Sequence, residues 1–121
     1  MRVFLGTALA AFMLVINPAL AETINTHTGT VKGITHNDIY AFLGIPYAAP
    51  PVGENRWRAP QPPASWKGTR NATQFGSDCA QAPFPAGSIP GLQTEPDEDC
   101  LFVNVWKPAG AKQGDALPVL V

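Results

Sequence analysis

The alternation of apolar and polar positions predicts short β-strands rather than helices. Residues 101–106 (Leu-Phe-Val-Asn-Val-Trp) carry apolar side chains at both parities. That pattern is typical of a strand covered on both faces, as in a sheet layered between helices. Leu117–Val121 shows the same pattern, and we expect a second such strand there. No stretch of residues 22–121 repeats apolar positions at the period of an amphipathic helix.

Two further regions have the pattern of extended chain. Residues 28–34 and 39–45 flank the turn-forming sequence His36-Asn37-Asp38, which predicts a β-hairpin. Residues 66–75 mix polar and apolar side chains on both parities, which indicates a partly exposed strand.

The most apolar stretch lies at the beginning of the chain. Arg2 precedes an apolar run over residues 3–16, Pro18 ends it, and Ala19-Leu20-Ala21 has the form of a cleavage site. The run is shorter than the about 20 residues that a membrane-spanning helix needs. We therefore interpret residues 1–21 as a secretory signal peptide cleaved after Ala21, not as an anchor. The protein is then secreted or periplasmic, with no membrane attachment after cleavage.

Composition limits what residues 22–121 do. Seven basic and nine acidic side chains remain there, a formal charge of −2, which argues against a nucleic-acid partner. Most of the 13 prolines cluster between Pro46 and Pro96, which predicts an irregular, extended middle. About a hundred residues of short strands and proline loops make a poor independent core. We therefore expect residues 22–121 to be the N-terminal fragment of a larger domain.

The chain has two cysteines, Cys79 and Cys100. Export would place them in an oxidising compartment, and only one pairing is possible, so we expect one disulfide. The segment between them is rich in proline and glycine, which predicts an irregular Ω-loop.

Three blocks of uncommon residues resemble the type-B carboxylesterase and cholinesterase family. Residues 44–60 follow the family pattern G-I-P-Y-A-x-P-P-V-G-x-x-R-W-x-x-P. Residues 66–81 repeat its W-K-G, F-G and C-A-Q elements. Residues 98–106 follow E-D-C-L-x-L-N-V-W, with Val103 in place of the usual leucine. The resemblance extends over residues 29–121.

The resemblance implies an α/β fold, the α/β-hydrolase fold. This chain would supply its N-terminal β-rich part: a hairpin, a proline-rich strap, the disulfide Ω-loop and the first strands of the central sheet. It also implies an ion pair between Arg56 and Glu98 that ties the strap to the foot of the loop, because a planar guanidinium suits a carboxylate. Two solvated surface charges are the alternative, and Arg58 is a second possible partner for Glu98.

In that family the disulfide loop lines the entrance to the active-site gorge. The bulky apolar residues of the loop, Phe84, Ile89 and Leu92, are therefore candidates to contact substrate. Packing of the loop on itself is the simpler interpretation of Phe84. The loop has no tryptophan, the residue with which cholinesterases bind choline, so the resemblance does not extend to cholinesterase specificity.

The family implies that the parent protein is a secreted serine hydrolase of small carboxylic esters. Its chemistry needs a serine in G-x-S-x-G, a histidine, an acid and a glycine-rich oxyanion loop. None of these motifs occurs in this sequence, and we interpret His27 and His36 as exposed residues near the hairpin turn. We expect no catalytic residue, metal or cofactor within residues 1–121, and no activity of the fragment alone. A non-catalytic adhesion protein and an inactive truncated product are the alternatives.

Overall fold

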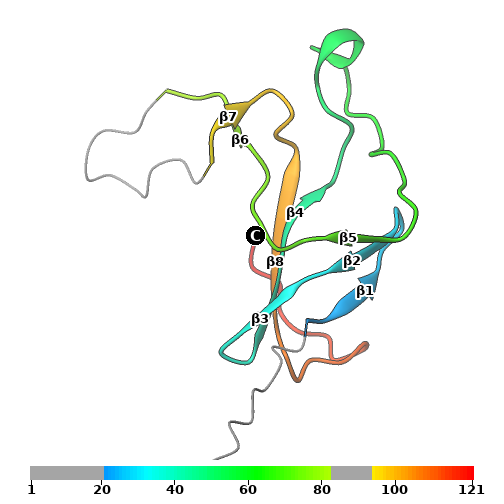
Figure 1. Cartoon of the computed structure of the whole chain (residues 1–121), viewed down its shortest axis with the longest axis vertical. Coiled ribbons are helices and arrows are strands. Elements are labelled where there is room, and N and C mark those ends of the chain that lie inside the picture. Colours follow the sequence, from blue (N-terminus) through cyan, green and yellow to red (C-terminus); the bar gives the residue numbers. More distant parts are fainter. Residues whose placement is uncertain (1–20, 83–93) are drawn as a thin grey trace, which may run out of the picture.

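The computed structural model describes residues 21–82 and 94–121. Its regular elements are short strands and one 3₁₀ helix, joined by long irregular segments (Figure 1). In chain order these elements are β1 (Thr23–Asn25), β2 (Thr30–Lys32), β3 (Ile34–His36), β4 (Ile39–Pro46), η1 (Gly53–Asn55), β5 (Thr69–Asn71), β6 (Asp78–Cys79), β7 (Pro96–Asp97) and β8 (Phe102–Pro108).

The predicted hairpin is present as β3 and β4, which pair antiparallel with His36 opposite Ile39. Asn37 and Asp38 form the two-residue turn with φ values of 47° and 60°. Asparagine and aspartate tolerate this left-handed region, and two positive φ values suit the twist of a hairpin. On the N-terminal side of the turn the structure differs from the prediction. The expected single strand is divided at Gly33 into β2 and β3, and β2 joins another sheet. A Cβ at Gly33 would lie 2.5 Å from the Ala41 carbonyl oxygen.

The longest ladder joins β4 to β8, which run side by side in Figure 1. They pair antiparallel from Ile39 opposite Pro108 to Pro46 opposite Phe102. The strand predicted at residues 101–106 is thus confirmed, although it begins at Phe102 and continues to Pro108.

A β-bulge interrupts this ladder where the register shifts between Phe42 and Ile45. Gly44 has φ 66° there, and the shift takes its N–H out of the ladder. That N–H donates to the side-chain oxygen Oδ1 of Asn104 at 2.8 Å. Asn104, the one polar residue among residues 101–106, therefore satisfies a backbone donor that the ladder leaves without a partner.

A second sheet has the order β1-β2-β5. β1 and β2 are antiparallel, and β2 and β5 are parallel. Backbone bonds around Ala72 connect this sheet to β4: Ala72 N–H donates to the Lys32 oxygen at 2.8 Å, and Leu43 N–H donates to the Ala72 oxygen at 2.9 Å.

The core lies where the two sheets meet and is small. Val31, Phe42 and Ala72 are 1%, 2% and 0% exposed. Four partly buried side chains pack around them: Ile24, Tyr40, Ile45 and Trp66. By contrast Val103 and Val105, on one face of β8, are 40% and 42% exposed. Trp106, on the opposite face, is 57% exposed, so within the described residues β8 is only partly covered.

A partly buried ion pair links the beginning of the described chain to β8. Lys107 Nζ donates to Glu22 Oε1 at 3.0 Å and to the Ala111 oxygen at 3.4 Å. The Lys107 ammonium also lies 5.3 Å from the centroid of the Tyr40 ring. The side chains of Glu22 and Lys107 are only 28% and 27% exposed, so water screens this pair less than a surface pair.

Two of the predicted strands differ in the structure. Only Thr69–Asn71 of residues 66–75 forms a strand, because Gly68 turns the chain at φ 75° immediately before it. The strand predicted at Leu117–Val121 is wrong, since these residues have no strand assignment. An apolar extended segment becomes a strand only when a neighbour takes up its backbone groups. No described strand pairs with this segment, and Pro118 has no N–H to donate.

Candidate functional site

The proline-rich strap positions Arg56 through one tight turn. Asn55 N–H donates to the Val52 oxygen at 3.0 Å, and Arg56 N–H donates to the Gly53 oxygen at 3.2 Å. The Asn55 side chain also donates to the Pro50 oxygen at 3.2 Å. These bonds form η1 within an otherwise extended segment and fix the direction in which the Arg56 side chain leaves the strap.

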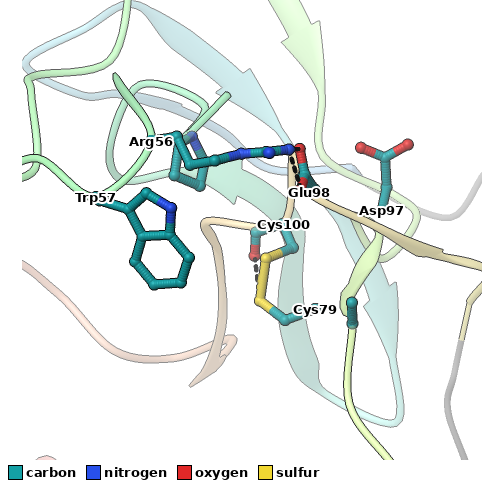
Figure 2. A pocket seen from close by; sticks show the side chains of 8 residues that line it. Arg56, Trp57, Cys79, Asp97, Glu98 and Cys100 are labelled. Atoms are coloured by element: carbon teal, nitrogen blue, oxygen red, sulfur yellow. Dashed lines mark hydrogen bonds and ion pairs between the residues drawn. A yellow bond between two sulfur atoms is a disulfide. The ribbon is translucent and has the colours of Figure 1, made fainter. Parts of the chain in front are cut away.

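Arg56 reaches the foot of the disulfide loop, where its Nη2 donates to both carboxylate oxygens of Glu98 (Figure 2). The hydrogen bond to Glu98, and then its negative charge, raise the pKa of the Arg56 guanidinium above its usual value. Both side chains are about half exposed, at 51% and 53%. Water therefore screens this pair, and its contribution is orientation more than stability.

Arg58, the alternative partner, does not bind Glu98. Its Nη2 lies 3.8 Å from Oε2 of Glu54, four residues earlier in the strap. Both side chains are largely exposed, so this contact is a weak surface pair.

The structure contains the Cys79–Cys100 disulfide. It lies beside the Arg56–Glu98 pair, at a shallow pocket of about 320 Å³. The pocket is lined by Pro51, Arg56, Trp57, Cys79, Ala80, Asp97, Glu98 and Cys100. Trp57 is 97% exposed and has φ 62°, so its ring stands free at the rim (Figure 2). The strap and the loop foot thus share one surface that combines an aromatic ring with acidic groups.

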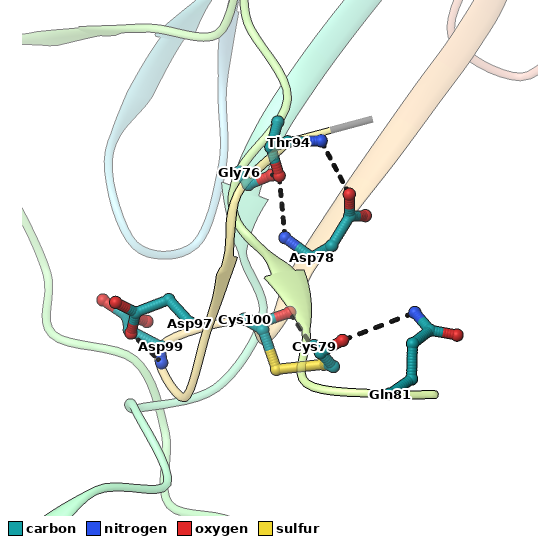
Figure 3. The surroundings of a disulfide bond; sticks show 8 residues. All are labelled: Gly76, Asp78, Cys79, Gln81, Thr94, Asp97, Asp99 and Cys100. Atoms are coloured by element: carbon teal, nitrogen blue, oxygen red, sulfur yellow. Dashed lines mark hydrogen bonds between the residues drawn. A yellow bond between two sulfur atoms is a disulfide. The ribbon is translucent and has the colours of Figure 1, made fainter. Parts of the chain in front are cut away.

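Sequence reasoning missed a second connection at the base of the loop, the polar clasp formed by Gly76, Asp78 and Thr94 (Figure 3). Asp78 N–H donates to Thr94 Oγ1 at 2.8 Å, and Thr94 N–H donates to Asp78 Oδ2 at 2.7 Å. The Thr94 hydroxyl donates in turn to the Gly76 oxygen at 3.0 Å. The only sequence signal was the pairing of hydroxyl and carboxylate residues near the two ends of a proline-rich loop.

Several predicted residues fall outside what the structure describes. Phe84, Ile89 and Leu92 lie in residues 83–93, and nearly all of the predicted signal peptide lies in residues 1–20. Of the histidines, His36 lies at the hairpin turn with Nε2 3.0 Å from Asn37 Nδ2. Over the described ranges 21–82 and 94–121, the structure has no helix of the length and apolarity that a membrane span requires.

The sequence of the chain matches an established protein family. A sequence model described as the Carboxylesterase family matches residues 21–121. The chain belongs to the carboxylesterase family.

Individual relatives give the same result. Fumonisin B1 esterase of Sphingopyxis macrogoltabida is 43% identical over 98 residues, covering 80% of this chain and 17% of that protein. Neuroligin-3 of Mus musculus is 40% identical over 125 residues, covering 82% and 15%. A solved PNB esterase structure superposes with TM-score 0.63 at 41% identity, covering 73% of this chain and 18% of that one.

These comparisons fix the fold. The chain corresponds to the N-terminal, strand-rich part of a type-B carboxylesterase, with the α/β-hydrolase fold expected from its sequence. It spans less than a fifth of the length of the relatives named above.

Proposed function

We propose that this chain is the N-terminal segment of a secreted serine hydrolase that cleaves small carboxylic esters. The observation that carries the proposal is the family match over residues 21–121, together with the ester hydrolases among the relatives. In such an enzyme a serine, activated by histidine and an acid, takes the acyl group from the ester and passes it to water. Those residues would lie outside this segment.

In this proposal the segment has a scaffolding role. Arg56, positioned by the turn at η1, binds Glu98 two residues before Cys100, and so orients the strap against the loop foot. A loop positioned in this way would set the shape of the substrate entrance, where Phe84, Ile89 and Leu92 remain the proposed contacts.

A non-catalytic binding protein is the second candidate function. Its support is the match to neuroligin-3, which covers 82% of this chain at an identity similar to that of the esterases. The two candidate functions differ in one respect. The hydrolase has an activated serine, which we place outside this segment, and the binding protein has none.

The test uses the full-length protein that contains this segment. It is incubated with a p-nitrophenyl butyrate substrate, with and without prior treatment by a fluorophosphonate that labels activated serines. Turnover that disappears as one phosphonate binds per chain supports the hydrolase. A folded protein with neither turnover nor adduct rejects the hydrolase and leaves the binding protein.

Export is the last part of the proposal, with cleavage after Ala21 so that Glu22 becomes the first residue. The disulfide is the supporting observation, since such bonds persist in oxidising compartments. N-terminal sequencing of the exported protein should begin at Glu22. A mature protein that retains Met1 would overturn this assignment without affecting the proposed esterase chemistry.

A further inference from the structure

Hydrogen bonds hold the base of the disulfide loop in addition to the disulfide itself. The polar clasp joins Asp78, the residue before Cys79, to Thr94 on the returning chain. Next to the clasp, β6 and β7 pair in parallel with Cys79 opposite Asp97. Asp97 Oδ1 then accepts the N–H of Asp99 at 2.7 Å, which fixes the turn that leads to Cys100. Figure 3 shows the clasp and the disulfide along the same two segments.

We propose that the polar clasp holds Cys79 and Cys100 side by side in the reduced protein and so templates their disulfide. Asp78 and Thr94 are partly buried, and one of the bonds between them is charge-assisted, which makes it stronger than a neutral one. With the disulfide formed the two Cα atoms are 5.0 Å apart, and this is the separation that the clasp would maintain between the reduced cysteines. Neither this proposal nor its test depends on ester hydrolysis.

The oxidation itself needs a small disulfide oxidant such as oxidised glutathione. The thiolate of one cysteine attacks that disulfide, which forms a mixed disulfide and releases one small thiolate. The second cysteine, as its thiolate, attacks the protein sulfur of the mixed disulfide and displaces the other small thiolate. The oxidant takes up the two electrons, and the two protons lost by the cysteines end on the released thiols. Because the second step is intramolecular, its equilibrium follows the effective concentration of one cysteine at the other.

Clasp and disulfide are then coupled reciprocally. If the clasp multiplies the effective concentration of the thiols by some factor, the disulfide multiplies the equilibrium constant for forming the clasp by the same factor. This coupling makes the proposal measurable from either side.

The first measurement is the thiol effective concentration in the full-length protein. The protein is equilibrated in glutathione buffers, its thiols are trapped by alkylation, and the oxidised fraction is read by mass spectrometry. Asp78→Ala and Thr94→Val should each lower the effective concentration by about tenfold to a hundredfold. The matched control is Gln81→Ala, which removes a bond of 3.4 Å to the Cys79 oxygen within the same segment and should have little effect. Equal values for Thr94→Val and Gln81→Ala would overturn the proposal.

A second measurement leaves the clasp residues intact, so it decides the matter even if Asp78→Ala fails to fold. In a Cys79→Ser/Cys100→Ser protein, hydrogen exchange is followed at the amides of Asp78 and Thr94. Both N–H groups are donors in the clasp, and we expect them to stay protected without the disulfide. Exchange of both amides at the rate of unstructured peptide, in an otherwise protected sheet, would show that the disulfide holds the clasp and not the reverse.

Discussion

The side chain of Asn104 offers a sharp test of how the β4–β8 ladder tolerates its bulge. Asn104→Leu keeps the size of the side chain but removes the oxygen that accepts the Gly44 N–H. The bulge takes that N–H out of the ladder, and the site is partly buried, so water replaces the lost partner incompletely. Leaving a buried donor unsatisfied costs about 1–3 kcal/mol. We expect the free energy of unfolding to fall by that amount, measured by urea denaturation of the oxidised, full-length protein.

Asn104→Asp is the matched control, because aspartate keeps an acceptor oxygen at the same position. It should cost clearly less than Asn104→Leu. Leucine is the better strand residue and is more apolar, so a packing argument alone predicts the opposite order. If Asn104→Leu unfolds at the same urea concentration as the native protein, or at a higher one, the Gly44 bond does not stabilise the bulge and our reasoning is refuted.

Three further predictions concern other contacts. Replacing Cys79 and Cys100 by serine should lower the free energy of unfolding by about 3 kcal/mol on the chain-entropy model, given their separation of 21 residues; unchanged stability under urea would contradict this. Lys107→Met should cost about 1.5–3 kcal/mol, and a double-mutant cycle with Glu22→Gln should show coupling. Residues 22–121 alone should not hydrolyse p-nitrophenyl esters. Turnover that is lost when Ser65, Ser77 and Ser88 are changed to alanine would refute that expectation.

The elements that depend on local sequence were predictable. The turn at Asn37-Asp38 and the strand at residues 101–106 follow from residue types within a few positions, and both occur in the structure. The parallel pairing of β2 with β5 depends on segments far apart in the chain, and no local pattern encodes it. Leu117–Val121 shows the same limit, because its apolar pattern predicts a strand but does not supply a neighbour.

The candidate site divides in the same way. Family resemblance located Arg56, Glu98 and the cysteines, because rare residues mark their positions. It did not suggest the bond between Asp78 and Thr94, because such residues are common in loops and their contact exists only once the loop ends meet. The resemblance predicts the motif that contains Asn104. The reason for its asparagine is a backbone N–H that the bulge removes from the ladder, and this follows only from the register of β4 and β8.

The pairing of β4 with β8 also dictates an order of events during synthesis. The bond from Gly44 to Asn104 spans 60 residues, so β4 emerges long before the strand that completes its sheet. Until then the hairpin of β3 and β4 presents apolar residues such as Ile39 and Phe42 without a partner strand. Contacts so distant in sequence form slowly, because the chain between them must first be ordered. The hairpin can therefore form before β8 has been made, and the edge of β4 that β8 covers stays unpaired until residues 102–108 follow.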